Sequence, residues 1–153
     1  MKYIIAYDGG GTKTRINVVD LAGNILFDKI TTGSNILSSG ANEFAIVIEG
    51  LFLEAKQTLS IKDNEIEYIY LGLSGADLEA DYKKLEKACS LIFNNIRFKV
   101  VNDAWIVLRS GLRKAYGACC IAGTGTNACA ISKSGEKAIL RALSYITGTF
   151  GGG

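Results

Sequence analysis

The stretch Asp8-Gly9-Gly10-Gly11-Thr12-Lys13-Thr14 follows directly on the apolar run 3–7. The apolar run predicts a buried strand, and the consecutive glycines predict a tight turn. Because glycine has no Cβ, the backbone N–H groups of such a turn can approach a bulky anion. The threonine hydroxyls and the lysine add donors, and the Asp8 carboxylate suits Mg²⁺. The stretch is therefore either a phosphate site or an ordinary glycine-rich hairpin turn.

The residues after the turn favour a second strand. Segment 15–20 alternates polar and apolar residues, and after a turn at 21–24 the run 25–30 predicts a third strand. A phosphate loop of the Walker type needs Gly-x-x-x-x-Gly-Lys-Ser/Thr at the start of a helix. Neither that spacing nor a helix is found here, so the Walker class is excluded.

Helices and strands alternate in the next part of the chain. Apolar residues repeat at helical spacing over 42–59, 78–92 and 104–115, and the runs 66–73 and 98–101 predict strands between these helices. Asp77 stands where the N-cap of the second helix is expected. The order up to 116 is β-β-β-α-β-α-β-α, which predicts an α/β domain with a mixed five-stranded sheet, antiparallel first and parallel afterwards.

A second glycine turn, Gly123-Thr124-Gly125-Thr126-Asn127, follows a predicted strand at 118–122. Further strands are expected at 128–132 and 137–143, so the opening pattern repeats. With Ala128 the turn also fits the G-x-G-x-x-A dinucleotide fingerprint, which requires a helix next and an acidic residue ~20 positions later. Gly135 interrupts any helix and no carboxylate lies near Gly148, so a Rossmann site is disfavoured.

Composition limits the class of protein. The chain has 153 residues, of which 48% are hydrophobic and 21% charged, as in an ordinary globular protein with one real core. The net charge is +2 and no Lys/Arg run exceeds two residues, so we expect no capture of nucleic acid or membrane. No apolar run approaches the ~20 residues of a membrane span and the N-terminus leads into a strand, so we expect a cytoplasmic protein.

Cysteine and histidine usage excludes further kinds of site. The cysteines are Cys89, Cys119, Cys120 and Cys129. They lie among apolar residues without C-x-x-C spacing, which predicts buried reduced thiols rather than disulfides or a metal site. The chain has no histidine, so histidine-based triads and the usual zinc sites are excluded.

The first turn with its flanking strands resembles the first phosphate motif of the actin, sugar kinase and heat-shock chaperone superfamily. The pattern is most similar to N-acetylglucosamine kinases and the related BadF/BadG/BcrA/BcrD ATPase family, and the element order of 1–116 is similar to the repeating domain of that superfamily. The resemblance implies an actin-like ATPase (ribonuclease H-like) domain over 1–116 and the opening strands of a second domain over 117–153. We accordingly expect a fragment, one piece of a split protein, or a homodimer.

The same resemblance implies ATP and Mg²⁺ as cofactors and assigns the site residues. Asn102-Asp103-Ala104 resembles the motif of the catalytic base, which makes Asp103 the base and a sugar ligand, although a plain helix cap is the other interpretation. Asp8 holds the metal through its waters. The nucleotide phosphates are expected at Asp8, Gly9, Gly10, Gly11, Thr12, Lys13, Thr14, Gly123, Thr124, Gly125 and Thr126. The substrate is expected at Asn35 of the loop 33–35, at Ser74 and Gly75 of the loop 73–77, and at Thr124 and Asn127.

One departure leaves the substrate open. Where the kinases carry Gly-Asp-x-Gly, this chain has Gly148-Thr149-Phe150-Gly151, and the Gly-Gly-Trp-Gly before it is replaced by 141–144. The resemblance favours an ATP-dependent phosphotransferase acting on an amino sugar. The alternatives are an ATPase that activates a dehydratase or reductase, and a binding module without turnover. We expect the 153 residues alone to be inactive, because adenine recognition in this superfamily resides in the second domain.

Overall fold

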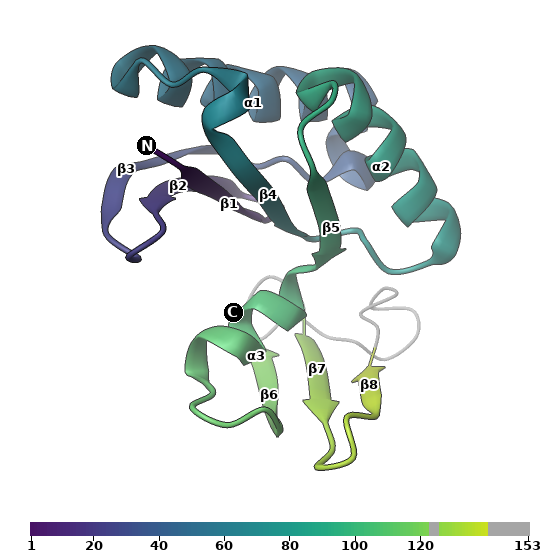
Figure 1. Ribbon diagram of the computed structural model, residues 1–153. Coiled ribbons are helices and arrows are strands. Elements are labelled where there is room, and N and C mark those ends of the chain that lie inside the picture. The colour runs from purple at the N-terminus through teal and green to yellow at the C-terminus, as the bar shows by residue number, and fades with distance from the viewer. Residues whose placement is uncertain (123–125, 141–153) are drawn as a thin grey trace. The chain divides into compact units, whose positions relative to one another are not determined.

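The computed structural model describes residues 1–122 and 126–140 (Figure 1). The chain divides into two compact units, residues 1–103 and 104–153. The division falls between Asp103 and Ala104, at the start of helix α3 (Asp103–Gly111), whereas the sequence suggested a boundary at 116. The interpretation of the second unit as the start of a second domain stays a prediction.

Unit 1 contains one mixed five-stranded sheet. Its strands are β1 (Tyr3–Gly9), β2 (Lys13–Asp20), β3 (Ile25–Thr32), β4 (Ile66–Leu73) and β5 (Phe98–Asn102), in the order β3-β2-β1-β4-β5. The pairs β1/β2 and β2/β3 are antiparallel, whereas β4 lies parallel to β1 and β5 parallel to β4. The predicted sheet, with its antiparallel strands first, is therefore confirmed.

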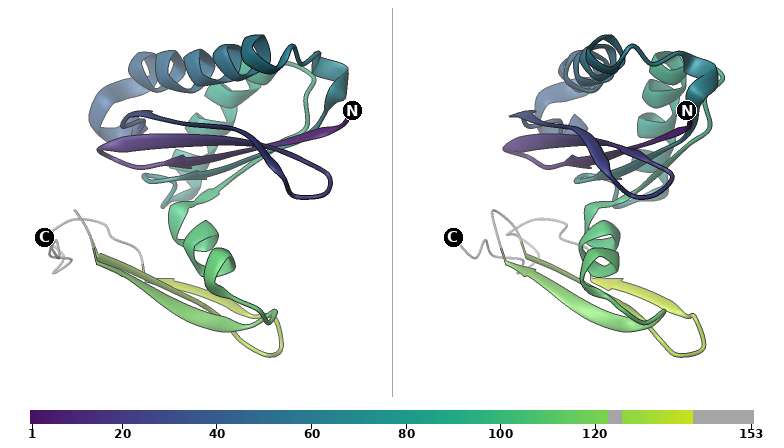
Figure 2. Two further views of the ribbon diagram at one scale, coloured as in Figure 1. Left: turned by 90° about the vertical axis from the view of Figure 1, so that its left-hand side faces the viewer. Right: turned by 60° about the vertical axis from the view of Figure 1, so that its left-hand side comes forward.

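Two helices, α1 (Ile36–Leu59) and α2 (Glu79–Phe93), lie over the same face of this sheet (Figures 1 and 2). Alternate residues of the strands, such as Ile5 and Tyr7, are buried beneath them. The Tyr7 hydroxyl donates a hydrogen bond to the Ile48 carbonyl of α1 (3.2 Å), and its burial raises its pKa well above the usual value. The Phe52 and Phe93 rings join the two helices in an edge contact, with centroids 5.2 Å apart.

Helix α1 begins at Ile36, six positions before the expected start at 42. Asn35 is its N-cap, with Oδ1 accepting a hydrogen bond from the Leu37 N–H (2.9 Å). The helix is interrupted at Gly40, whose φ of 85° and ψ of 168° are not helical. Serine and glycine are poor helix formers, so the first turn gives no periodic signal in the sequence.

Gly40 and Gly50 of α1 provide a matched test of this kink. A side chain at Gly40 is strained by the backbone conformation although its surroundings are open, so Gly40→Ala is expected to destabilise the protein by about 1–3 kcal/mol. Gly50 is exposed, has helical geometry and has nothing within 4 Å of the position that an added methyl group would take, so Gly50→Ala should stabilise it by about 0.5–1 kcal/mol. Urea unfolding of both variants measures the difference, and equal stability of the two would contradict the kink.

By length and composition alone, one helix in the described part of the chain, α1, is long and apolar enough to cross a membrane. The core helix of a soluble protein passes the same test. The apolar content of α1 has a structural explanation, because its buried residues pack in the core of unit 1. These are Ile36, Phe44, Ile48, Leu51, Phe52 and Ala55.

Two further helix ends differ from expectation. Leu78, not Asp77, is the N-cap of α2, and its N–H donates to the Asp81 carboxylate (3.1 Å). The prediction for Asp77 was wrong because its side chain is engaged with strand β5 instead. Helix α3 (Asp103–Gly111) ends four positions before the expected residue 115, consistent with the low helix propensity of glycine.

A short 3₁₀ helix, η1 (Asp63–Glu65), precedes β4.

Unit 2 packs α3 residues against an antiparallel sheet. Its strands are β6 (Gly117–Ala122), β7 (Thr126–Ile131) and β8 (Lys137–Leu140), in the order β6-β7-β8, so the strand order of β1-β2-β3 is repeated. Ala104, Leu108 and Cys129 form its buried centre. The expected end of the last strand, at 141–143, lies outside the described residues.

Candidate functional site

Three parallel strands of unit 1 end in register. Gly9 of β1 is paired with Leu73 of β4, and Leu73 with Asn102 of β5. The chain therefore leaves the sheet at one edge at Gly10, Ser74 and Asp103. In α/β sheets ligands bind outside the carboxyl ends of the strands, so this edge is the candidate site.

The glycine turn occupies this edge with much of its backbone exposed. The Gly10 N–H donates to the Lys13 carbonyl (2.9 Å), which closes the turn. Gly11, Thr12 and Lys13 are exposed, and a Cβ on Gly11 would meet nothing within 4 Å. Asp8, also exposed, lies just before the turn. The turn thus offers an anion open space beside its backbone, a cation and a carboxylate.

Hydrogen bonds connect the loop 33–35 to this turn. The Ser34 N–H donates to the Gly10 carbonyl (3.0 Å), and the Thr14 hydroxyl donates to the Ser34 hydroxyl (2.8 Å), with both residues buried. Gly33 lies so close that a Cβ there would be 2.1 Å from the Gly11 carbonyl oxygen. Because its hydroxyl is buried in this contact, we expect Thr14 to act by positioning the turn rather than through a hydroxyl contact with phosphate.

The buried hydroxyl pair can be tested by a double-mutant cycle. Ser34→Ala or Thr14→Val leaves one buried hydroxyl without its partner, which should cost about 1–3 kcal/mol of unfolding free energy. The double variant removes both hydroxyls and should lose no more than the worse single variant. Thermal unfolding measures this, with Thr12→Val at the exposed neighbouring position as a control expected within about 0.5 kcal/mol of wild type. Additive losses would rule out the pairing.

The two loops assigned to the sugar are neighbours. Gly75, at φ +84°, lies so near Asn35 that a Cβ would be 2.9 Å from Asn35 Oδ1. The Ser74 N–H donates to the Gly9 carbonyl (2.7 Å), which joins this loop to the end of β1. Ser74 Oγ is buried and has no hydrogen-bond partner among the described residues. Since buried hydroxyls are nearly always hydrogen bonded, a ligand at this edge would explain the orphan group.

Asn102 fixes the end of β5 to the same loop. Its Nδ2 donates to Asp77 Oδ1 (2.9 Å) and to the Ala76 carbonyl (3.3 Å), its N–H donates to the Tyr82 hydroxyl (3.1 Å), and it is only 2% exposed. Asp103 follows as the half-buried first residue of α3, where the helix dipole favours an ionised carboxylate. Asn102 therefore positions the backbone of the proposed base.

Sequence reasoning missed two of these supporting residues, Ser34 and Asn102. Both residues lie in motifs that were identified in the sequence. In each motif, however, the functional role was assigned to the adjacent residue, Asn35 or Asp103. The signal for Asn102 is a polar amide that directly ends an apolar strand, where it must find buried partners. For Ser34 no local signal exists, because its partner Thr14 is 20 positions away.

The BadF/BadG/BcrA/BcrD ATPase family matches residues 7–151. The chain belongs to this family. It is 33% identical to the N-acetylmuramic acid/N-acetylglucosamine kinase of Clostridium acetobutylicum over 153 residues, which are 100% of this chain and 50% of the relative. It is also 33% identical to the N-acetyl-D-glucosamine kinase of Dictyostelium discoideum, over 97% of this chain and 50% of the relative. The chain thus spans about half the length of the curated relatives it matches.

The same fold is found in a solved structure. A Chromobacterium violaceum protein described as a candidate N-acetylglucosamine kinase superposes with a TM-score of 0.77 at 24% identity, over 95% of this chain and 50% of its own. The fold is that of the actin-like ATPases, as the sequence predicted.

Residues 123–127, the expected second glycine turn, fall in unit 2. Gly123, Thr124 and Gly125 lie outside the described residues, as does the departure at 148–151. Thr126 and Asn127 are described as the first residues of β7 and not as part of the turn, and Asn127 Oδ1 accepts a hydrogen bond from the Ala128 N–H (2.8 Å). Their roles in phosphate and sugar binding stay predictions.

No metal-binding group of three or more His, Cys, Asp or Glu side chains occurs among the residues that the structure describes. Mg²⁺ in phosphotransferases is commonly held by one or two carboxylates, waters and substrate phosphates. The exposed carboxylate of Asp8 beside the turn fits that mode of binding.

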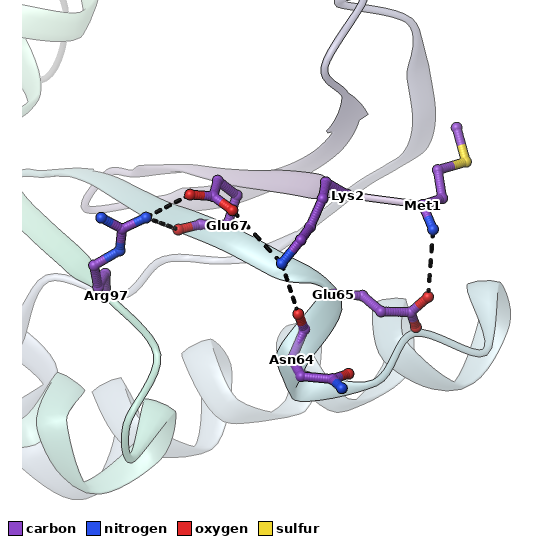
Figure 3. Close-up of polar contacts among 6 residues, drawn as sticks. All are labelled: Met1, Lys2, Asn64, Glu65, Glu67 and Arg97. Atoms are coloured by element: carbon purple, nitrogen blue, oxygen red, sulfur yellow. Dashed lines mark hydrogen bonds and ion pairs between the residues drawn. The ribbon is translucent and has the colours of Figure 1, made fainter.

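A hollow of about 390 Å³ lies at the opposite edge of the sheet, where the parallel strands begin. Two cations that line it, Lys2 and Arg97, already have polar partners (Figure 3). Arg97 Nη2 lies 2.5 Å from Glu67 Oε1, and Lys2 Nζ lies 3.7 Å from Glu67 Oε2 and 2.9 Å from the Asn64 carbonyl oxygen. With these charges paired among themselves, we assign no ligand to this hollow.

Proposed function

We propose that the complete protein transfers the γ-phosphoryl group of ATP to a hydroxyl of N-acetylglucosamine or a closely related amino sugar. The observation that carries this proposal is the gathering of the glycine turn, Asn35, Ser74 and Asp103 at one edge of the sheet of unit 1. The names of the curated relatives support an N-acetylated sugar as the acceptor. A cytoplasmic location suits such a substrate and is part of the proposal.

The proposed chemistry uses the residues of this edge. The backbone N–H groups and Lys13 of the glycine turn hold the nucleotide phosphates, and Thr14 and Ser34 keep the turn in place behind them. Mg²⁺, held through Asp8, would neutralise phosphate charge. The sugar lies against Asn35, Ser74 and Gly75, and the orphan Ser74 hydroxyl gains a hydrogen bond from it or to it.

Asp103 acts as the general base. Its carboxylate accepts the proton of the sugar hydroxyl as that oxygen attacks the γ-phosphorus and the bond to ADP breaks. The products are ADP, the sugar phosphate and the proton. The phosphate turn follows Gly9 of β1, and the base follows Asn102 of β5. Both of these residues lie in one register row with Leu73 of β4, the strand between them.

The test uses the completed protein, defined as these 153 residues together with the remaining half of a family relative such as the Clostridium kinase. It is incubated with Mg·ATP and either N-acetylglucosamine, N-acetylmuramic acid or glucose, and ADP and the sugar product are quantified by mass spectrometry. We expect one sugar phosphate per ADP with an N-acetylated sugar. ADP without any sugar phosphate would instead indicate an activating ATPase, and bound nucleotide without ADP a binding module.

A further inference from the structure

Unit 2 holds two thiols in direct contact. Cys119 of β6 and Cys129 of β7 are cross-strand partners in the antiparallel pair, and their Sγ atoms are 3.5 Å apart. Both thiols also lie near the Ala104 carbonyl oxygen, at 3.7 Å for Cys119 and 3.2 Å for Cys129. The two sulfurs therefore share one side of the hairpin and one environment.

This arrangement suits a covalent bond between the sulfurs. Directly opposed residues of antiparallel strands have Cα atoms about 4.5–5.5 Å apart, within the range that a disulfide spans. The sulfurs need to approach by about 1.5 Å to reach the bonded distance of ~2.05 Å. Rotation of the two side chains supplies a movement of that size without rearranging the strands.

The other cysteines lack such a partner geometry. Cys120 is exposed, contrary to the sequence prediction of a buried thiol, because the side chains of a strand alternate and it lies opposite Ala128. Cys89 is buried in unit 1, and burial, with a smaller effect of Glu86, raises its pKa to about 12. Cys119 is half-buried and so reachable by a small oxidant, whereas its partner Cys129 is only 3% exposed.

We propose that Cys119 and Cys129 form a redox-sensitive dithiol that peroxide closes to an intramolecular disulfide. The Cys119 thiolate attacks one peroxide oxygen, the O–O bond breaks, and sulfenic acid and water are formed. The Cys129 sulfur then attacks the Cys119 sulfur, the S–OH bond breaks, and a second water leaves. Two thiols are oxidised and one hydrogen peroxide is reduced to two waters.

The bond would lie close to the second glycine turn. From the Cys119–Cys129 pair the register runs through Cys120–Ala128 and Ile121–Asn127 to Ala122–Thr126, the pair that flanks residues 123–125 in the sequence. A disulfide would fix β6 to β7 and remove both S–H groups from the Ala104 carbonyl. Oxidation is thus placed to act on the hairpin that we propose for phosphate binding.

Hydrogen peroxide treatment of the folded 153-residue chain, followed by alkylation in denaturant, intact-mass measurement and peptide mapping, tests the proposal. We expect two of the four thiols to escape alkylation, a loss of two hydrogens per chain, one cross-linked peptide joining Cys119 to Cys129, and full reversal by dithiothreitol. Because no step uses ATP or sugar, the result is independent of the proposed function.

Variants sharpen the assignment. Cys120→Ser keeps the pair and should close like wild type, whereas Cys119→Ser should form no intramolecular bridge. A bridge through Cys120, between chains or within one, would overturn the proposal, as would oxidation that stops at sulfinic acid on Cys119 with Cys129 still alkylatable. Mapping of the wild-type chain decides the matter even where a variant fails to fold.

Discussion

Replacing Asp103 by asparagine is expected to lower kcat of the completed protein by about 10²–10⁴-fold, the usual contribution of a general base. The amide cannot accept the hydroxyl proton, but asparagine suits the start of a helix about as well as aspartate. The melting temperature and the affinity for nucleotide should therefore stay unchanged. Phosphorylation kinetics, thermal unfolding and nucleotide titration of the same preparation measure all three.

The matched control is Glu79→Gln, which changes an exposed carboxylate in the first turn of α2 that forms an ion pair with Lys83 one helical turn later. This variant should keep wild-type kcat. Near-normal kcat in the Asp103 variant would show that Asp103 has only a structural role at the start of α3. Asp8 would then be the remaining carboxylate to which we assign a role in the reaction.

Gly33→Ala should have the second large effect. The added methyl group would lie 2.1 Å from the Gly11 carbonyl oxygen and 2.9 Å from the Thr12 nitrogen, so the glycine turn must move away from loop 33–35. We expect a loss of about 1–3 kcal/mol in unfolding free energy, as for other overpacked sites, together with loss of nucleotide binding because the turn is displaced. Urea unfolding and nucleotide titration measure the two effects.

Gly11→Ala separates the two effects. Its methyl group would meet nothing within 4 Å, so stability should change by no more than about 0.5 kcal/mol. The methyl group would enter the space that we assign to phosphate, so nucleotide binding should still weaken. Unchanged binding in Gly11→Ala would show that this turn is not the phosphate cradle, and wild-type stability in Gly33→Ala would contradict the close contact between Gly33 and the turn.

The parts of the fold that were predicted correctly depend on local patterns. The glycine turn between two apolar strands and the helical periodicity of 78–92 identify elements without knowledge of their partners. Strand pairing then follows, because consecutive hairpin strands are antiparallel and helix-linked strands are parallel. The first turn of α1 was missed because Ser38, Ser39 and Gly40 carry no apolar signal, and Asn35, assigned to sugar alone, also caps that helix.

The supporting contacts of the site could not be predicted, because they join residues far apart in the sequence. Asn102 donates to Asp77 from 25 positions away, and this bond removes Asp77 from the N-cap position that its place before α2 suggested. The hydrogen-bond partner of a polar side chain such as Asp77 depends on which groups are buried beside it, and that burial arises only when the sheet is assembled. The orphan hydroxyl of Ser74 is likewise visible only in the folded structure.

Amide hydrogen exchange of the completed protein, with and without Mg·ATP and N-acetylglucosamine, tests most directly whether the carboxyl edge of the sheet is the site. We predict that ligands protect peptides covering 8–14, 33–35 and 74–77 and leave peptides at the opposite edge, around 61–67 and 95–97, unchanged. Protection confined to that opposite edge, or none in the first set at saturating ligand, would contradict the assignment of the site to the carboxyl edge.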